Sequence, residues 1–226
     1  MKATETSILE FLQQPIQLIA FDPRRNYHWM KKECQQLWDD IVRITQDEAT
    51  SSHYLGAVVY VEYGVFKGTQ VSKLILLDGQ QRLVTICLLL AALSNENAKE
   101  RPEVRRVSTN DLLFNGHDKE ESCYKLIPSL REQDTFFRII KNESLTSVVP
   151  SRLTRNYQFF INNIRDCGIR TDILYKGISK LTVMDISTDR KYENPKTVYD
   201  SIMATGLDKT QAGLIRNWLG FLQSGS

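Results

Sequence analysis

Five consecutive polar or special residues, Asp-Gly-Gln-Gln-Arg at positions 78–82, interrupt a stretch of the chain that is otherwise largely apolar. Residues 74–77 before them and residues 83–93 after them both have the composition of buried segments. A polar group left unpaired between such segments would cost about 1–3 kcal/mol. We therefore expect the carboxylate, the two amides and the guanidinium either to form an internal hydrogen-bond network or to face a ligand in a pocket.

The two flanking segments predict a strand that turns directly into a helix. Residues 71–77 contain a short apolar run with β-branched content, and residues 83–93 repeat apolar side chains at helical spacing and on most faces. Gly79 would let the backbone turn sharply and let a ligand come close. Because the first N–H groups of a helix have no partner within it and carry partial positive charge, the turn predicts an anion-binding site.

Arg82 would lie in the first turn of that helix, where its charge opposes the helix dipole by about 0.3–1 kcal/mol. A bound phosphate would reverse the sign of this effect, because the guanidinium and the helix N-terminus would then share one anion. Alternatively, Asp78 and Arg82 have the spacing of an ion pair that only stabilises the turn. The two interpretations are compatible, since Asp78 can hold Arg82 in position for a ligand.

A nucleoside triphosphate is a ligand that suits these groups. The N–H groups of residues 79–81 would cradle phosphate, and Arg82 would neutralise its charge. Gln80 or Gln81 could orient the attacking water. Asp78 could hold Mg²⁺ or orient Arg82, although Mg²⁺ would be bound mainly through the phosphates.

A second candidate group, Arg25, Tyr27 and Trp29, lies upstream. Aromatic side chains beside an arginine suit stacking on DNA bases and gripping phosphate. Tyr27 and Trp29 could instead be anchors of the core. Arg25 could also reach the same anion as Arg82.

The sequence around these residues resembles the DGQQR domain of GmrSD-type, modification-dependent restriction proteins, a domain that looks like a relative of the ParB/sulfiredoxin fold. The resemblance extends from about residue 10 to residue 220. Four stretches carry it in the family's order: RNYHW at 25–29, HYLGAVV at 53–59, DGQQR at 78–82 followed by Thr85, and VYDSIMATGLDKTQAGLIRN at 198–217. The sequence departs from the family pattern at Arg24, Met203 and Gly213, where relatives have Gln, Asn and Asp.

The resemblance implies an α+β fold, in which a small mixed sheet of ParB/sulfiredoxin type carries the 78–82 turn and a large helical part packs on it. Residues 1–98 would form this core and residues 99–226 the mainly helical part, unless the two are one continuous domain. The implied function is a nucleotide-binding and nucleotide-hydrolysing sensor domain of a bacterial restriction, or phage-defence, system. It would use Mg²⁺ with an NTP, GTP being favoured, and its partners would be modified DNA and an HNH-type nuclease domain or subunit.

The expected site residues follow from both lines of reasoning. The catalytic residues would be Asp78, Gln81 and Arg82; the phosphate-binding residues Gly79, Gln80, Gln81, Arg82, Thr85 and Arg25; and the DNA-binding residues Arg25, Tyr27 and Trp29. No metal site built from protein ligands alone is expected. Two other functions stay open: a modified-DNA-binding module without NTP turnover, and a scaffold in which residues 78–82 form only a buried network.

The composition limits other classes of function. The 226 residues carry a formal net charge of +2, which is too small to imply non-specific nucleic-acid binding by bulk charge. Local basic pairs, such as Lys31 with Lys32 and Arg152 with Arg155, are either solvated helix faces or phosphate contacts. Four scattered cysteines have no zinc spacing. With no signal peptide and no apolar run of about 20 residues, we expect no membrane span and a cytoplasmic location.

Periodicity and breaker residues predict the remaining elements. The expected helices cover residues 7–14, 31–45, 80–95, 132–141, 152–166, 169–175, 195–203 and 210–222, and the expected strands cover 16–22, 55–62, 73–77 and 181–186.

Overall fold

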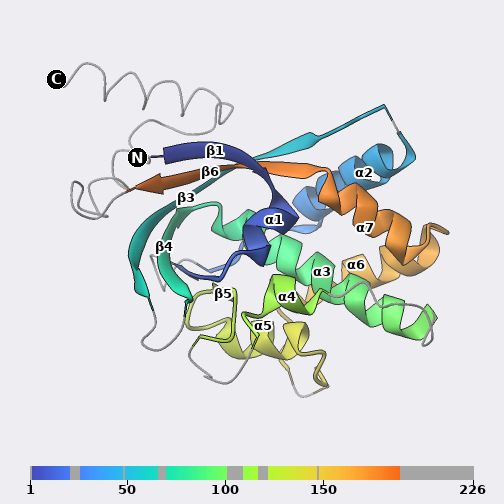
Figure 1. Ribbon diagram of the computed structural model, residues 1–226. Coiled ribbons are helices and arrows are strands. Elements are labelled where there is room, and N and C mark those ends of the chain that lie inside the picture. The colour runs from blue at the N-terminus through green and yellow to red at the C-terminus, as the bar shows by residue number, and fades with distance from the viewer. Residues whose placement is uncertain are drawn as a thin grey trace.

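A computed structural model describes residues 2–20, 26–47, 49–65, 70–100, 109–116, 122–146 and 148–188. Within them, one six-stranded mixed sheet is covered by helices, which confirms the expected α+β class (Figure 1). The strands are β1 (Lys2–Ser7), β2 (Ile16–Ala20), β3 (His53–Val65), β4 (Ser72–Asp78), β5 (Leu126–Ile127) and β6 (Leu181–Thr188). The helices are α1 (Ile8–Gln13), α2 (Lys31–Gln46), α3 (Gln80–Glu100), α4 (Asn110–Leu113), α5 (Gln133–Ile140), α6 (Arg152–Asp166) and α7 (Thr171–Ser179).

The strand order is β1-β6-β3-β4-β2-β5. Strand β2 runs parallel to both β4 and β5, whereas β3 pairs antiparallel with β4, as the expected hairpin requires. Strand β3 then runs parallel to β6, and β6 antiparallel to β1. The carboxyl ends of β2, β4 and β5 therefore lie at the same edge of the sheet, which we call the motif edge because residues 78–82 lie there.

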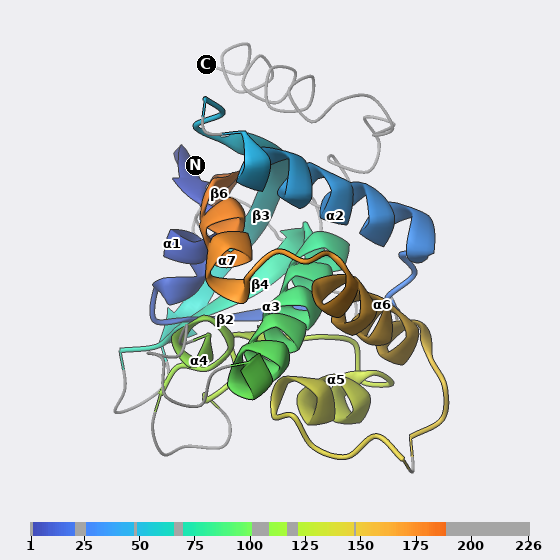
Figure 2. The ribbon, with the colours of Figure 1, turned by 90° about the vertical axis from the view of Figure 1, so that its right-hand side faces the viewer.

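Alternating side chains of the strands divide the core between the two faces of the sheet. Val58 and Tyr60 of β3 face the large cluster formed with the helices. Ala57, Val59 and Val61 of the same strand belong to a smaller cluster on the opposite face. Figure 2 shows the helices α2, α3, α6 and α7 gathered in front of the sheet.

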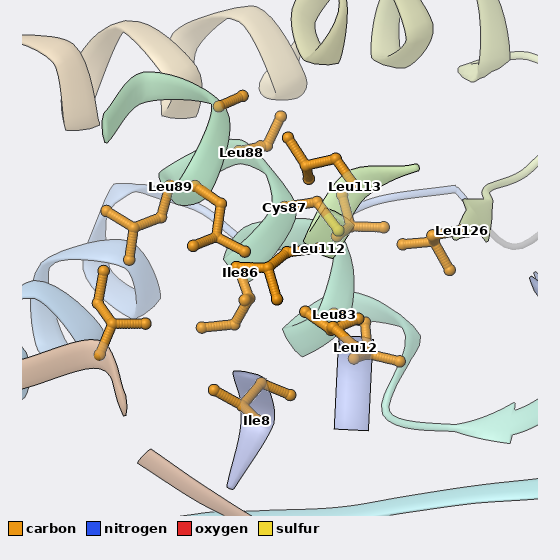
Figure 3. Close-up of a cluster of buried hydrophobic side chains, with 14 of the residues drawn as sticks. Ile8, Leu12, Leu83, Ile86, Cys87, Leu88, Leu89, Leu112, Leu113 and Leu126 are labelled. Carbon is orange, nitrogen blue, oxygen red and sulfur yellow. The ribbon is translucent and has the colours of Figure 1, made fainter. Parts of the chain in front are cut away.

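Helix α3 is the centre of the helical layer and contacts α4, α5, α6 and α7 (Figure 2). All its side chains over residues 83–93 are buried, so this part of the helix is covered on every face, whereas the sequence predicted burial on most faces. Figure 3 shows Leu83, Ile86, Cys87, Leu88 and Leu89 among apolar side chains of neighbouring elements. Truncating one of these leucines to alanine in such a setting costs about 2–5 kcal/mol. The packing therefore fixes the position of the first turn of α3.

The expected elements within the described residues are present, with some boundaries extended. Helix α3 continues to Glu100 and α7 to Ser179. Strand β1 and the short helix α4 were not expected. Strands β5 and β6 both come from the part of the chain after residue 98, and both belong to the sheet. The helices expected over 195–203 and 210–222 lie outside the described residues. Among the described helices, none combines the length and the apolar composition needed to cross a membrane.

Candidate functional site

Three segments meet at the motif edge, each beyond the carboxyl end of one parallel strand. The motif turn, residues 78–82, closes β4, residues 26–29 lie beyond β2, and residues 128–132 follow β5. Hydrogen bonds join them: the Glu132 carboxylate accepts from the backbone N–H of Tyr27 at 2.8 and 3.0 Å, and Gln81 binds the same segment. Ligands of open parallel sheets bind beyond the carboxyl ends of strands, so this edge is the natural place for a site.

The motif turn can be formed only with a residue that accepts unusual backbone angles and close packing. Gly79 has φ +94°, a conformation that side chains strongly disfavour. A Cβ atom at Gly79 would lie 3.1 Å from the carbonyl oxygen of Ala57 and 3.3 Å from the Cα of Val58. Its own carbonyl accepts the first helical bond, from Leu83 N at 2.9 Å. Glycine therefore allows β4 to turn into α3 directly against β3.

Arg82 is half-buried beside this turn, and its Nη1 donates to the carbonyl oxygen of Ala57 at 2.7 Å. Strand β3 extends past the last β3–β4 pair, Val59 with Asp78, so the carbonyl of Ala57 faces the turn. In the described part of the chain, Arg82 makes no close ion pair and no other hydrogen bond. The close Asp78–Arg82 pair considered from the sequence is thus not formed. Within the described chain, most donors of this guanidinium therefore have no partner.

The electrostatic setting of Arg82 favours an anion. Burial lowers the pKa of the guanidinium, while Asp78 and Tyr54 act on it from a longer range and raise the pKa. An arginine stays charged in spite of such a shift. A partly desolvated positive charge at a helix N-terminus, without a contact counter-ion among the described residues, is stabilised by any anion that enters.

The Gln81 side chain holds the segment beyond β2. Its Oε1 accepts from the backbone N–H of His28 at 2.8 Å and of Trp29 at 3.4 Å, and its Nε2 donates to the carbonyl of Asn26 at 3.1 Å. The amide oxygen therefore has both lone pairs engaged, and one N–H of the amide has no partner among the described residues. Gln80 is also largely buried, at 8% exposure.

Beneath the motif turn, Gln81, Thr85, Tyr27 and Asn156 form a buried chain of hydrogen bonds, which we call the Tyr27 network. The Thr85 hydroxyl donates to the carbonyl of Gln81 at 2.8 Å, so it must accept from the Tyr27 hydroxyl 2.7 Å away. Tyr27 in turn accepts from Asn156 Nδ2 at 2.9 Å, and the same Nδ2 donates to the Trp29 carbonyl at 3.0 Å. Burial raises the pKa of the Tyr27 phenol, which keeps it protonated as a donor.

Two residues that were expected to contact a ligand are instead buried in this network. Thr85 is fully buried and Tyr27 is 2% exposed, so both lie beneath the site and neither offers a face to solvent. Tyr27 is the core anchor that the sequence allowed as an alternative. Trp29 is half-buried. Arg25, and the departures at Met203 and Gly213, lie outside the described residues.

Three contributors to the site were missed from the sequence. Asn156 is 3% exposed on the apolar side of α6, between Leu153 and Phe160, and a buried amide in an apolar stripe could have indicated it. The sequence around Glu132 contains no comparable pattern that could have indicated its role. Tyr54, 42% exposed on β3, lies near enough to Arg82 to influence its pKa.

A metal would find few protein ligands here. Among the residues that the structure describes, no group of three His, Cys, Asp or Glu side chains is placed to hold a metal ion. Asp78 is the carboxylate of the motif turn, and its side chain makes no hydrogen bond or close ion pair within the described chain. It is therefore free to contact a cation that arrives with a ligand.

Comparison with known protein families finds a match that covers most of the chain. The family model of the GmrSD restriction endonuclease, N-terminal domain, matches residues 8–220, a span that includes the motif turn and the Tyr27 network. No curated protein matches the chain.

Proposed function

Because the chain belongs to the family of the GmrSD restriction endonuclease, N-terminal domain, we propose that it is the nucleotide-binding and nucleotide-hydrolysing sensor domain of a modification-dependent restriction system. The family expected from four sequence stretches is thereby confirmed. Membership gives the restriction context, in which DNA and a nuclease are the partners. Nucleotide binding at the motif turn and recognition of modified DNA are our proposals within that context.

One observation carries the nucleotide site: the guanidinium of Arg82 is half-buried at the start of α3 with one hydrogen bond and no close ion pair among the described residues. An arginine and a carboxylate or phosphate frequently form a two-pronged pair, and Arg82 forms no such pair within the described chain. The interpretation as a scaffold accounts for Gln81 and Thr85, whose hydrogen bonds are internal, but within the described chain it gives no role to the charge of Arg82.

Each residue of the motif turn would have a separate role in binding or hydrolysing a nucleotide. The N–H groups at the start of α3 would bind the phosphate oxygens, and Gly79 would let them approach the backbone. Arg82 would neutralise the charge that develops as water attacks the terminal phosphorus and the bond to the leaving diphosphate breaks. Gln81 would orient that water with its remaining N–H. Tyr54, exposed beside Arg82, would lie against the base or ribose.

Mg²⁺ fits the site as a companion of the nucleotide. When bound, it would neutralise phosphate charge, mainly through the phosphate oxygens themselves. Asp78 is the side chain that would contact it, since this carboxylate makes no hydrogen bond and no close ion pair within the described chain. GTP is the nucleotide that the family resemblance favours. The ParB/sulfiredoxin type of the sheet belongs to the same proposal, supported by the position of the turn between β4 and α3.

Phosphate release from the four NTPs with Mg²⁺ tests the proposal. Wild type should release phosphate, and Arg82→Ala should release it about 10²–10³-fold more slowly, as when one transition-state donor is removed. Asp78→Ala should also be slower. Arg43→Ala, which removes an exposed arginine of α2, is the control and should match wild type.

Equal release from all four proteins would contradict the proposal. A chain that binds modified DNA and releases no phosphate would instead support the alternative function, a DNA-binding module without turnover.

A further inference from the structure

A groove lies between the start of α2 and the side of α6, apart from the motif turn. Its volume is about 570 Å³. The lining residues that matter below are Trp29, Lys31, Arg152, Arg155, Asn156 and Phe159. We call this hollow the α2–α6 groove.

Among the described residues, the charged side chains that line the groove are all cationic. Lys31, Arg152 and Arg155 line it together with apolar and amide side chains, and no carboxylate of the described chain contributes to the lining. Within the described chain, none of the three cations makes an ion pair or a side-chain hydrogen bond. Glu33, the acidic residue in the first turn of α2, is occupied by the backbone N–H of Met30 at 2.8 Å.

The helix ends add to this positive charge. Lys31 is the first residue of α2 and Arg152 the first residue of α6, helices of 16 and 15 residues. At these positions a cation opposes the helix dipole, which costs stability unless an anion is near. Three cations without an ion pair in the described chain, together with the N-terminal ends of two helices around one hollow, therefore favour an occupant that carries more than one negative charge.

The remaining lining favours a base as well as phosphate. Trp29 and Phe159 are half-buried aromatic side chains, which offer stacking faces, and Asn156 adds an amide. Asn156 uses its Nδ2 within the Tyr27 network, whereas its Oδ1 accepts no hydrogen bond from the described residues. Amides of this kind bind base edges.

We infer that the α2–α6 groove binds a nucleotide of a DNA strand, with the backbone phosphates on Lys31, Arg152 and Arg155 and the base against Trp29 and Phe159. The inference rests on the proposed function only for the choice of DNA as the nucleic acid. The DNA contact expected at Tyr27, which is buried, is thereby placed on a surface that includes Trp29 of the expected set, while Arg25 lies outside the described residues.

Binding of fluorescein-labelled DNA, followed by anisotropy across a salt series, tests the groove. The double variant Arg152→Ala/Arg155→Ala should bind at least roughly tenfold more weakly than wild type. The slope of log affinity against log salt concentration should also be smaller in magnitude by about 1–2, because each arginine removed would take away one phosphate contact. The control Arg43→Ala/Lys176→Ala removes the same charge from α2 and α7 outside the groove, and should keep both quantities near wild type.

A second variant tests the stacking face without removing charge. Phe159→Leu keeps an apolar side chain on α6 and should weaken DNA binding roughly tenfold. Phe137→Leu, a half-buried aromatic stacked on Tyr124 away from the groove, should not. Normal binding by Phe159→Leu would overturn the base-binding part of the inference, and equal binding by the two double variants would overturn all of it.

Free dGMP distinguishes a polymer site from a mononucleotide site. If the arginine double variant loses dGMP binding and keeps DNA binding, the groove is not a DNA site and the inference is overturned. The anisotropy assay contains no NTP, so it is independent of turnover. Loss of DNA binding in the groove variant, with no phosphate release from wild type, would support the groove and contradict the proposed function.

Discussion

Gly79 is the residue that lets the motif turn exist, and its role has two separable parts. One is its positive φ, and the other is the close approach of β3. Gly79→Ala should lower the free energy of unfolding by about 2–4 kcal/mol, from backbone strain together with the contact to Ala57. Gly168, at φ +67° with open space where a Cβ would be, supplies the control. Gly168→Ala should cost about 1–2 kcal/mol. Both variants would be measured by urea unfolding. An equal loss in the free energy of unfolding of Gly79→Ala and Gly168→Ala would show that the close approach of β3 does not contribute.

Lys125 provides a titration that is independent of the proposed site. It is 2% exposed, its Nζ donates to the carbonyl of Gln14, and burial lowers its pKa from 10.5 to about 8, with Asp111 opposing the shift. Between pH 8 and 10.5 the unfolded chain therefore keeps a proton that the native chain has released. Stability contributed by this group rises with pH across that window.

The prediction from Lys125 is a difference between two pH profiles. From pH 8 to 10.5, the free energy of unfolding of wild type should rise by about 1–3 kcal/mol relative to that of Lys125→Met. Taking the difference cancels the buried cysteines, which titrate in both proteins. Lys176→Met, at an exposed lysine of α7, should give a profile parallel to wild type. A profile of Lys125→Met that also runs parallel would contradict the account of Lys125.

At the scale of elements, the Tyr27 network connects the α2–α6 groove to the first turn of α3. Asn156 lines the groove and binds both Tyr27 and the Trp29 carbonyl, while Gln81 accepts from the N–H of Trp29. We therefore expect DNA to change the rate of phosphate release, and Tyr27→Phe to reduce that change. Removing the hydroxyl should also lower the free energy of unfolding by about 1–2 kcal/mol.

Tyr157→Phe is the matched control for this prediction. Tyr157 is likewise buried, and its hydroxyl accepts one hydrogen bond, from Asn95 at 3.0 Å, outside the network. Its variant should lose similar stability and keep the full response to DNA. If phosphate release by Tyr27→Phe responded to DNA as strongly as wild type does, the network would not connect the two sites.

The elements that the sequence predicted well are those with a strong local pattern. Helix α3 has apolar side chains on most of its faces, and the β3–β4 hairpin follows from two apolar strands around a turn. Strand β1 has no such pattern, because its residues are polar and mostly exposed, and its pairing with β6 joins segments far apart in the chain. Long-range partners such as Glu132 for Tyr27 cannot be found from local spacing. The same holds for Asn156 in the Tyr27 network.

At the scale of the whole molecule, the sheet joins both ends of the described chain. Strand β6 lies between β1 and β3, and β5 lies beside β2 at the opposite end of the sheet. This arrangement brings the carboxyl ends of β2, β4 and β5 to one edge and covers one face with the helices that surround α3 (Figures 1 and 2). A ligand at the motif turn would thus contact the most deeply packed helix, and its binding energy would stabilise the entire fold.

Thermal unfolding with and without nucleotide measures that stabilisation directly. With Mg²⁺ and GTP at about a hundred times the dissociation constant, binding contributes about 2.7 kcal/mol, which raises the Tm of a chain of this size by about 5–10 °C. We predict this rise for wild type and for Arg43→Ala, and little or none for Arg82→Ala. No rise in wild type with any of the four NTPs, or the same rise in Arg82→Ala, would contradict a nucleotide site at the motif turn.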